Sequence, residues 1–269
     1  MANGKFQISA AGGISASTGI ADLVDVGINQ SKTLLSQQRS CAQVDRKDCI
    51  RVTDLRTATT AMYGAGVAGL LEPVAELAVG YGMTDNLDVG GRVRGGMQRL
   101  DVNYQLMDGG PEHTGWTSLV SLSYSHQKGA LPIPQLQSLL ELLGMGDNTR
   151  HNFDLALAMG GRLGDYGWVT FGGRYLLGRY NLDLRPELPF PILDDAVGDV
   201  VVKALPRTDE NGWSHQAGVF VNVLAGYKFI YVGAELSAAR YTAHMMLLGN
   251  DEKVSGVAIQ PSLIVLTRF

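Results

Sequence analysis

The side chains best suited to acid–base chemistry are histidines placed near serine and aspartate. Four of the five histidines stand at the ends of segments that alternate apolar and polar residues. The histidines are His126, His151, His215 and His244, and the neighbours are Ser123, Ser125, Asp154 and Ser214. A hydrolase pairs such a nucleophile with such a base. No known hydrolase motif matches these positions, so hydrolysis of lipid or peptide stays an alternative and we assign no catalytic residue.

Other chemistry-bearing motifs are missing from the sequence. It contains no phosphate-binding loop, no G-x-S-x-G and no H-E-x-x-H. A net charge of −4 supplies no basic stripe for nucleic acid. Cys41 and Cys49 bracket a short polar loop, and we expect a disulfide between them if the chain is exported. We expect no metal and no cofactor.

Period-two alternation of apolar and polar residues runs through most of the chain. Phe153, Leu155 and Leu157 share one face, whereas Asp154 and Ala156 share the other. This pattern predicts half-buried strands. We expect strands at 72–84, 87–95, 99–106, 116–126, 151–162, 168–180, 213–228, 230–243 and 254–269, with a tenth at 5–15.

Hydropathy and loop lengths point to a membrane barrel. The mean hydropathy is +0.04, yet no uncharged apolar stretch of about 18 residues exists to span a bilayer as a helix. The connections alternate between tight turns and long loops, and outer-membrane barrels place the short turns on the periplasmic rim. The sequence therefore predicts an all-β fold, a closed antiparallel transmembrane β-barrel of about ten strands, with short helices in long extracellular loops.

The less apolar face of the strands carries charges of both signs among small residues. In a membrane barrel this face points into the lumen, where charges persist when they are paired. We predict an ion-pair network across a narrow lumen. Its members are Glu76, Asp88, Arg92, Arg94, Asp101, Asp154, Arg162, Arg174 and Glu235.

Aromatic residues gather at the expected strand ends. Trp168, Tyr227, Phe229, Tyr231, Tyr81 and Phe269 fall at the periplasmic ends, and Trp213, Tyr180, Tyr241 and Tyr124 fall at the outer ends. Two such girdles are typical of the membrane interfaces of a barrel.

Two long loops contain apolar stretches, at 131–145 and 188–205. Leu136, Leu139, Leu140 and Leu143 fall at helical spacing. Together with Phe190 and Ile192, they are the candidates for binding a small hydrophobic ligand at the barrel mouth. The alternative is that these segments pack on one another as a lid.

The last strand, GVAIQPSLIVLTRF, places Leu263, Val265 and the terminal Phe269 at alternate positions. It is similar to the C-terminal insertion signal of the outer-membrane β-barrel proteins of Gram-negative bacteria. This resemblance implies an outer-membrane location, contact with outer-membrane lipid and insertion by the barrel-assembly machinery. Thr267 departs from the usual more hydrophobic residue, and Pro261 predicts a bulge because it removes a backbone donor.

The chain then divides into two parts. Residues 1–71 are expected to supply one strand and a helical loop or plug segment containing the two cysteines, and residues 72–269 the remaining strands. Because the chain opens without a signal peptide, we expect a mature sequence with an added start methionine. The leading functional hypothesis is binding or transport of a small hydrophobic compound. A structural or adhesin-like barrel with a sealed lumen is the alternative.

Overall fold

The structure is a computed structural model. It describes residues 4–13, 16–18, 50–51, 74–94, 96–107, 115–128, 147–163, 166–184, 190–194, 199–203, 208–227, 229–247 and 250–268. Among these residues, no helix is long and apolar enough to cross a membrane.

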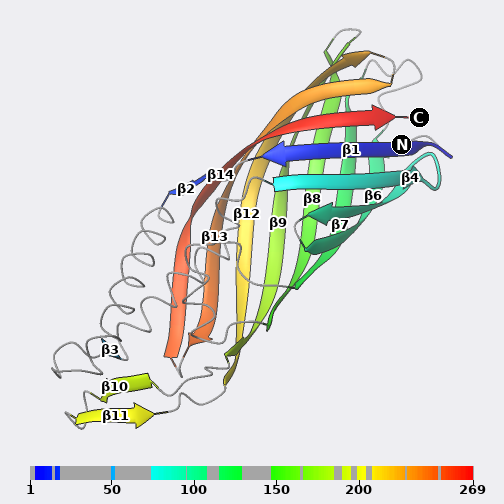
Figure 1. The fold of residues 1–269 in the computed structure, drawn as a ribbon. Helices are drawn as coiled ribbons and strands as arrows, with labels where there is room; N and C mark the ends of the chain where they lie inside the picture. The colour runs from blue at the N-terminus through cyan, green and yellow to red at the C-terminus, as the bar shows by residue number, and fades with distance from the viewer. Residues whose placement is uncertain are drawn as a thin grey trace.

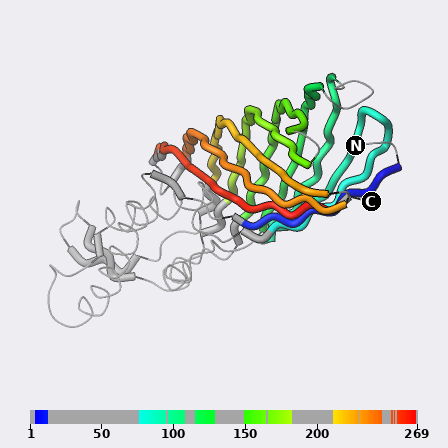
Figure 2. Tube along the Cα trace, turned by 90° about the horizontal axis from the view of Figure 1, so that it is seen from above, coloured from blue at the N-terminus to red at the C-terminus, as the bar shows by residue number. Residues whose placement is uncertain are grey.

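Ten long strands form one antiparallel sheet that closes on itself (Figures 1 and 2). Each strand pairs with the next in the order β1-β4-β5-β6-β7-β8-β9-β12-β13-β14, and β14 pairs back with β1. The shorter strands are β1 (Phe6–Gly13), β4 (Val74–Gly82), β5 (Leu87–Arg94), β6 (Met97–Met107) and β7 (Thr117–Lys128). The longer strands are β8 (Asp147–Leu163), β9 (Gly167–Leu184), β12 (Thr208–Tyr227), β13 (Ile230–Leu247) and β14 (Asn250–Arg268). The predicted closed barrel of ten antiparallel strands is confirmed.

The stagger of the strands fixes the width of the barrel. Following the in-register partners once around the sheet from Leu266 leads back to β14 at Val254, twelve residues away. With ten strands, this stagger gives a tilt of about 40° and a backbone radius of about 10 Å. Opposite walls are therefore separated by little more than the length of two long side chains.

Alternation along the strands sends most of the large apolar residues outward. Leu100 is 68% exposed and Leu263 is 69% exposed, whereas the inward-facing Asp101 is 3% exposed. A soluble barrel would show the opposite arrangement, because its apolar side chains would fill the interior. The outer surface thus requires a lipid environment.

At the end where both termini lie, short connections join β4 to β5, β8 to β9 and β12 to β13 (Figure 1). In the turn between β4 and β5, the Thr84 hydroxyl accepts hydrogen bonds from the backbone N–H groups of Asn86 and Leu87 at 3.4 and 3.1 Å. At the opposite end, Gly96 adopts a φ of 81° in the tight turn between β5 and β6. A left-handed residue there favours glycine.

Several sequence-based expectations need correction at the outer end. The predicted loop at 244–253 is largely strand, because β13 runs to Leu247 and β14 begins at Asn250. The stretch at 188–205 contains β10 (Phe190–Asp194) and β11 (Asp199–Lys203) instead of the expected helix. These two strands form a small sheet with β3 (Ile50–Arg51). Pairing between β13 and β14 passes through Pro261 without interruption, so the predicted bulge is absent there, and the register shift lies between Gln105 and Met107.

The N-terminal strand continues along β14. β2 (Ala16–Thr18) pairs with β14 so that Ala16 lies opposite Ile259, in the same register in which Gly13 of β1 lies opposite Ser262. The seam of the barrel is therefore extended toward the outer end. The proposed division of the chain at residue 71 falls outside the described residues.

Candidate functional site

The interior of the barrel carries a chain of ion pairs along β4 to β8. Arg92 donates from Nη1 to Glu76 Oε1 at 3.1 Å and from Nε to Asp101 Oδ2 at 2.7 Å. Arg99 donates from Nε to Asp101 Oδ1 at 2.6 Å and from Nη1 to Asp154 Oδ2 at 3.0 Å. Asp101 therefore holds one guanidinium on each carboxylate oxygen.

The strand register explains this arrangement. Arg92 and Arg99 lie directly opposite each other on β5 and β6, a pairing of like charges that is unfavourable without compensation. Asp101 lies two residues along β6 on the same inward face, within reach of both. The Arg99 Nη2 also donates to Ser123 Oγ of β7 at 2.7 Å, so this side chain crosses β7 to reach β8. Each of these guanidinium N–H groups donates either to a carboxylate or to the Ser123 hydroxyl. Buried charges require such partners.

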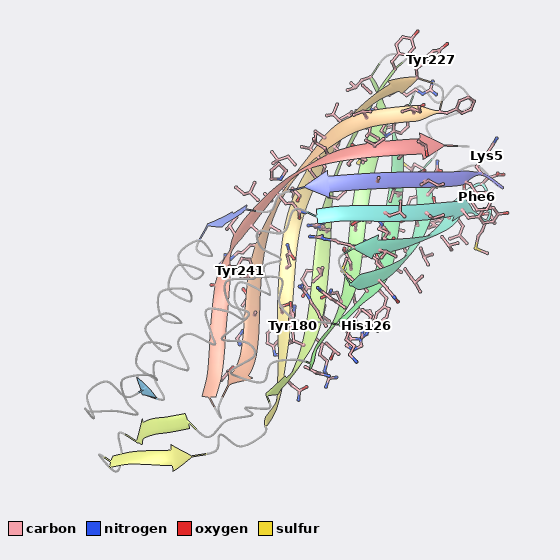
Figure 3. The ribbon with its side chains drawn as sticks, in the orientation of Figure 1. Lys5, Phe6, His126, Tyr180, Tyr227 and Tyr241 are labelled. Atoms are coloured by element: carbon pink, nitrogen blue, oxygen red, sulfur yellow. The ribbon has the colours of Figure 1, made fainter. Side chains whose placement is uncertain are left out.

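A second polar cluster lies toward the outer end of the lumen. Asn152 accepts from Arg150 Nε at 2.8 Å and donates to Ser125 Oγ at 3.0 Å. The Arg150 guanidinium sits 4.9 Å from the centre of the Tyr180 ring, whose hydroxyl is 2.9 Å from Ser214 Oγ. Asn152, Tyr180 and Ser214 are 4%, 3% and 2% exposed. The cluster thus fills the inner side of β7, β8, β9 and β12, and Figure 3 labels Tyr180 within this wall.

The predicted network is only partly the observed one. The structure brings together Glu76, Arg92, Asp101 and Asp154, and it adds Arg99, which the sequence reasoning missed. Arg99 lies on the same alternating face as Asp101, so its spacing was the available signal. The predicted strand begins at Arg99, whereas β6 begins two residues earlier, at Met97.

The remaining predicted charges have other surroundings. Asp88 accepts a hydrogen bond from Asn103 Nδ2 at 2.6 Å, and Arg94 lies in register with Glu76. Among the described residues, Arg162, Arg174 and Glu235 form no ion pair. The observed network therefore follows one wall of the lumen.

The histidines lie on the opposite face of the wall from their supposed catalytic partners. His126 and His151 share the outward face with Tyr124 and Phe153, and His215 shares it with Trp213. The candidate nucleophiles and carboxylate point into the lumen. They are Ser123, Ser125, Asp154 and Ser214. Because the sheet separates the two groups, they do not form a nucleophile and base in one site. His113 lies outside the described residues.

The aromatic girdles are partly as expected. Tyr81, Tyr227 and Phe229 are exposed near the termini, and Tyr124 and Trp213 are exposed toward the other end. Four predicted girdle residues instead share the inward alternation of their strands: Trp168, Tyr180, Tyr231 and Tyr241. Exposed aromatics that the sequence reasoning did not assign include Phe6, Tyr166 and Tyr175.

The ligand and insertion residues divide between described and undescribed parts of the chain. Leu136, Leu139, Leu140, Leu143, Cys41, Cys49 and Phe269 lie outside the described residues, so the disulfide stays a prediction. Phe190 and Ile192 lie in β10. Leu263 and Val265 of β14 face outward, and the Thr267 hydroxyl donates to the Ile8 carbonyl at 3.2 Å.

A closed ten-stranded sheet with an apolar exterior and an ion-paired interior defines a class. It is the class of outer-membrane β-barrels, whose single-chain members have an even number of antiparallel strands. This chain is such a barrel, and its location is the outer membrane of a Gram-negative bacterium.

No known protein family and no curated protein sequence matches the chain. Among solved structures, it is similar to Neisserial surface protein A, with 10% identity, a TM-score of 0.34, and coverage of 98% of this chain and 96% of that one. A major outer membrane protein of Thermus thermophilus gives 14% identity, a TM-score of 0.37, and coverage of 74% and 100%. The attachment invasion locus protein Ail of Yersinia pestis is 9% identical, with a TM-score of 0.31 and coverage of 99% of this chain and 99% of that one.

Proposed function

We propose that the protein is a sealed outer-membrane barrel that acts at its outer face by binding a partner outside the cell. The observation that carries this proposal is the filled outer half of the lumen. The inward-facing Asn152, Tyr180, Ser214 and Tyr241 are each at most 4% exposed. Residues lining an open aqueous pore would be solvated, so this interior favours a structural or adhesin-like role over bulk transport.

The ion-pair network supports the same conclusion at mid-height. A backbone radius of about 10 Å leaves space for little beyond the side chains of opposite walls. The Arg92 and Arg99 side chains extend along the lumen from one wall and are fixed by three carboxylates. A network held in this way resists displacement by a passing solute, because breaking any of its three pairs to Asp101 or Asp154 leaves a buried carboxylate.

The strands on the two sides of the barrel differ in length, and this difference indicates where the function lies. A tilted strand spans a bilayer with about 9–11 residues. β5 has 8 residues, whereas β12 has 20 and β14 has 19. The strands from β8 to β14 therefore continue beyond the membrane as a curved wall on the side away from the termini (Figures 1 and 2). Rigid strands that project from a cell surface are a suitable platform for a binding partner.

Cell attachment tests this proposal. Bacteria displaying the wild-type protein would be compared with bacteria displaying a variant in which residues 190–203, containing β10 and β11, are replaced by a short Gly-Ser linker. Both strains would be applied to epithelial monolayers and to surfaces coated with matrix proteins. We expect attachment by the wild type and its loss in the variant, with equal amounts of folded barrel in both. Equal attachment of the wild type and an empty-vector strain would refute the adhesin-like role.

A second candidate function is binding of a small hydrophobic compound, and one observation favours it. The inward face of β12 carries Phe220 and Leu224, and the inward face of β14 carries Ile264 and Leu266. Apolar groups on the wall away from the ion pairs provide a surface that such a compound prefers. Titration of the folded barrel with a fluorescent fatty acid tests this. Saturable binding that F220Q weakens would support the candidate, and unsaturable partitioning equal in both proteins would exclude it.

A further inference from the structure

An unbroken row of basic and aromatic residues crosses six neighbouring strands on the outside of the barrel. In-register pairing joins His126 of β7 to His151, His151 to Arg179, Arg179 to Trp213, Trp213 to His244, and His244 to Lys253 of β14. Each of these positions lies on the outward alternation of its strand. We call these six residues the outer row.

The outer row rises from the edge of the apolar band into the lipid headgroups. On the outward face of β12, fourteen positions separate Trp213 from Tyr227, the exposed aromatic near the opposite rim. At a tilt of about 40°, this separation corresponds to about 35 Å along the membrane normal. The apolar band of such barrels is about 25 Å tall, with aromatic girdles at both edges. Trp213 therefore lies just beyond the acyl chains. Because the strands are tilted by about 40°, the in-register row is inclined to the membrane plane by the same angle, so it rises by about 15 Å from His126, near the edge of the apolar band, to Lys253 among the headgroups.

The charges of the outer row have one sign. Arg179 and Lys253 are exposed, and among the described residues no carboxylate forms an ion pair with either. Arg240 is also exposed and outward-facing, two outward positions closer to the membrane centre than His244 on β13. The nearest outward acid on β14 is Asp251, two residues beyond Lys253. Unpaired cations at the boundary of the hydrocarbon attract the anionic headgroups of neighbouring lipids.

The rings of the outer row contact one another in pairs, and the pair between the two cations is stacked. Trp213 stacks on His244, with ring centres 4.3 Å apart and an interplanar angle of 17°. The rings of His126 and His151 have centres 4.8 Å apart. The Tyr124 hydroxyl lies 2.7 Å from His151 Nδ1, which holds that imidazole in place. Aromatic rings that carry polar groups are typical of the headgroup region, where one part of the side chain contacts lipid and the other contacts water.

From this juxtaposition, we propose that the outer row binds the phosphate groups of a phosphorylated outer-leaflet lipid. The guanidinium of Arg179 and the ammonium of Lys253 supply charge-assisted hydrogen bonds to phosphate oxygens. The Trp213–His244 stack lies between these two cations in the row and faces the carrier of the phosphate. This lipid site is independent of the partner-binding role proposed above, because it lies on the membrane-facing side of the wall.

Binding of lipid A to the folded barrel in detergent, counted by native mass spectrometry, tests the proposal. The test variant is R179Q/K253Q. The matched control is K5Q/R162Q, which removes the same charge at the opposite rim, where Lys5 and Arg162 are exposed and outside the observed ion-pair network. Each surface cation contributes about a fivefold change in affinity for an anionic lipid. We therefore expect at least about tenfold weaker binding by the test variant and unchanged binding by the control.

Two further probes separate the lipid from its phosphate. Dephosphorylated lipid A should bind the wild type as weakly as lipid A binds the test variant. Inorganic phosphate alone should not displace lipid A at an equal phosphate concentration. Equal binding by the test and control variants, tight binding of dephosphorylated lipid A, or displacement by free phosphate would each overturn the proposal. Refolding yield and heat-modifiable migration of both variants show that any loss does not come from misfolding.

Discussion

Arg99 of β6 and Asp154 of β8 form an ion pair across the strand between them, with 3.0 Å from Nη1 to Oδ2. Ser123 of the intervening β7 accepts a second hydrogen bond from the same guanidinium at 2.7 Å. This contact joins the short wall of the barrel, which ends with β7, to the tall wall, which begins with β8. The interior network thus links the strands of the short wall to those of the tall wall.

Replacing Asp101 should destabilise the barrel. In D101N, Arg92 and Arg99 lose the carboxylate that they share, and the interior retains two guanidinium groups with fewer acceptors. We expect a loss of about 3 kcal/mol in the free energy of unfolding, at the low end for a broken buried pair because the Arg92 side chain is 37% exposed. Urea titration in lipid vesicles measures it. D85N, in an exposed turn, is the control and should shift stability by less than about 0.5 kcal/mol. Equal effects of the two changes would show that the network does not stabilise the fold.

Two adjacent glycines of β9 should respond differently to alanine. A Cβ on the inward Gly172 would collide with the backbone carbonyl of Leu157 and approach Phe220 Cζ to 2.9 Å. A Cβ on Gly173 meets only the Gly218 carbonyl oxygen, at 3.7 Å. G172A should therefore cost about 1–3 kcal/mol, whereas G173A should be neutral or slightly stabilising. Folding yield and urea midpoints compare them, and a tolerated G172A would argue against the close approach of β8 and β9.

Charge on the lipid-facing surface should depend on depth. Val221 lies near the middle of the outward-facing segment between Trp213 and Tyr227 of β12, and Asn211 lies beyond Trp213 on the same strand. V221R should cost about 2–4 kcal/mol, because arginine at the membrane centre is poorly solvated, and N211R about 0–1 kcal/mol. Equilibrium folding into vesicles gives both values. Similar costs at the two positions would show that the membrane does not lie between Trp213 and Tyr227 of β12.

Trp116 and Trp168 should report on which face of the wall each of them lies. Trp116 is 51% exposed and packs edge-on to the outward Phe171, with ring centres 5.6 Å apart. Trp168 points inward and donates from Nε1 to Thr170 Oγ1 at 3.1 Å. In proteins with a single tryptophan, lipids with brominated acyl chains should quench Trp116 strongly and Trp168 weakly. Strong quenching of Trp168 would place it in the lipid.

The strand pattern made the architecture predictable from the sequence. Alternation such as that of Phe153 to Gly160 identified both the strands and their outward faces, because the side-chain period of a strand is two. The outer boundaries were harder. β13 continues past Ala243 through His244 to Leu247, a segment without glycine or proline that our prediction had assigned to a loop. The stretch at 190–203 has apolar residues that suggested a helix, but Val200, Val201 and Val202 are β-branched and favour the observed strand.

The candidate site was less accessible from the sequence. Spacing placed Asp101 and Arg92 on one face, but which carboxylate meets which guanidinium depends on the register and stagger of the strands. Tyr180 was expected at an outer girdle, and its position two residues from Gly178 on the inward face places it in the lumen. The outer row likewise cannot be identified from the sequence alone, because His126 and Lys253 join one row only through the pairing of six strands.

Planar-bilayer recording of the refolded wild-type protein most directly tests the claim that the lumen is sealed. Flotation of the same preparation with lipid vesicles would first establish that the barrel has inserted. We predict no current steps above the bilayer baseline, because the ion pairs of Arg92 and Arg99 and the buried cluster around Asn152 fill the interior. Stable, ohmic steps from the inserted wild-type protein would contradict the account and return transport to the first place among its functions.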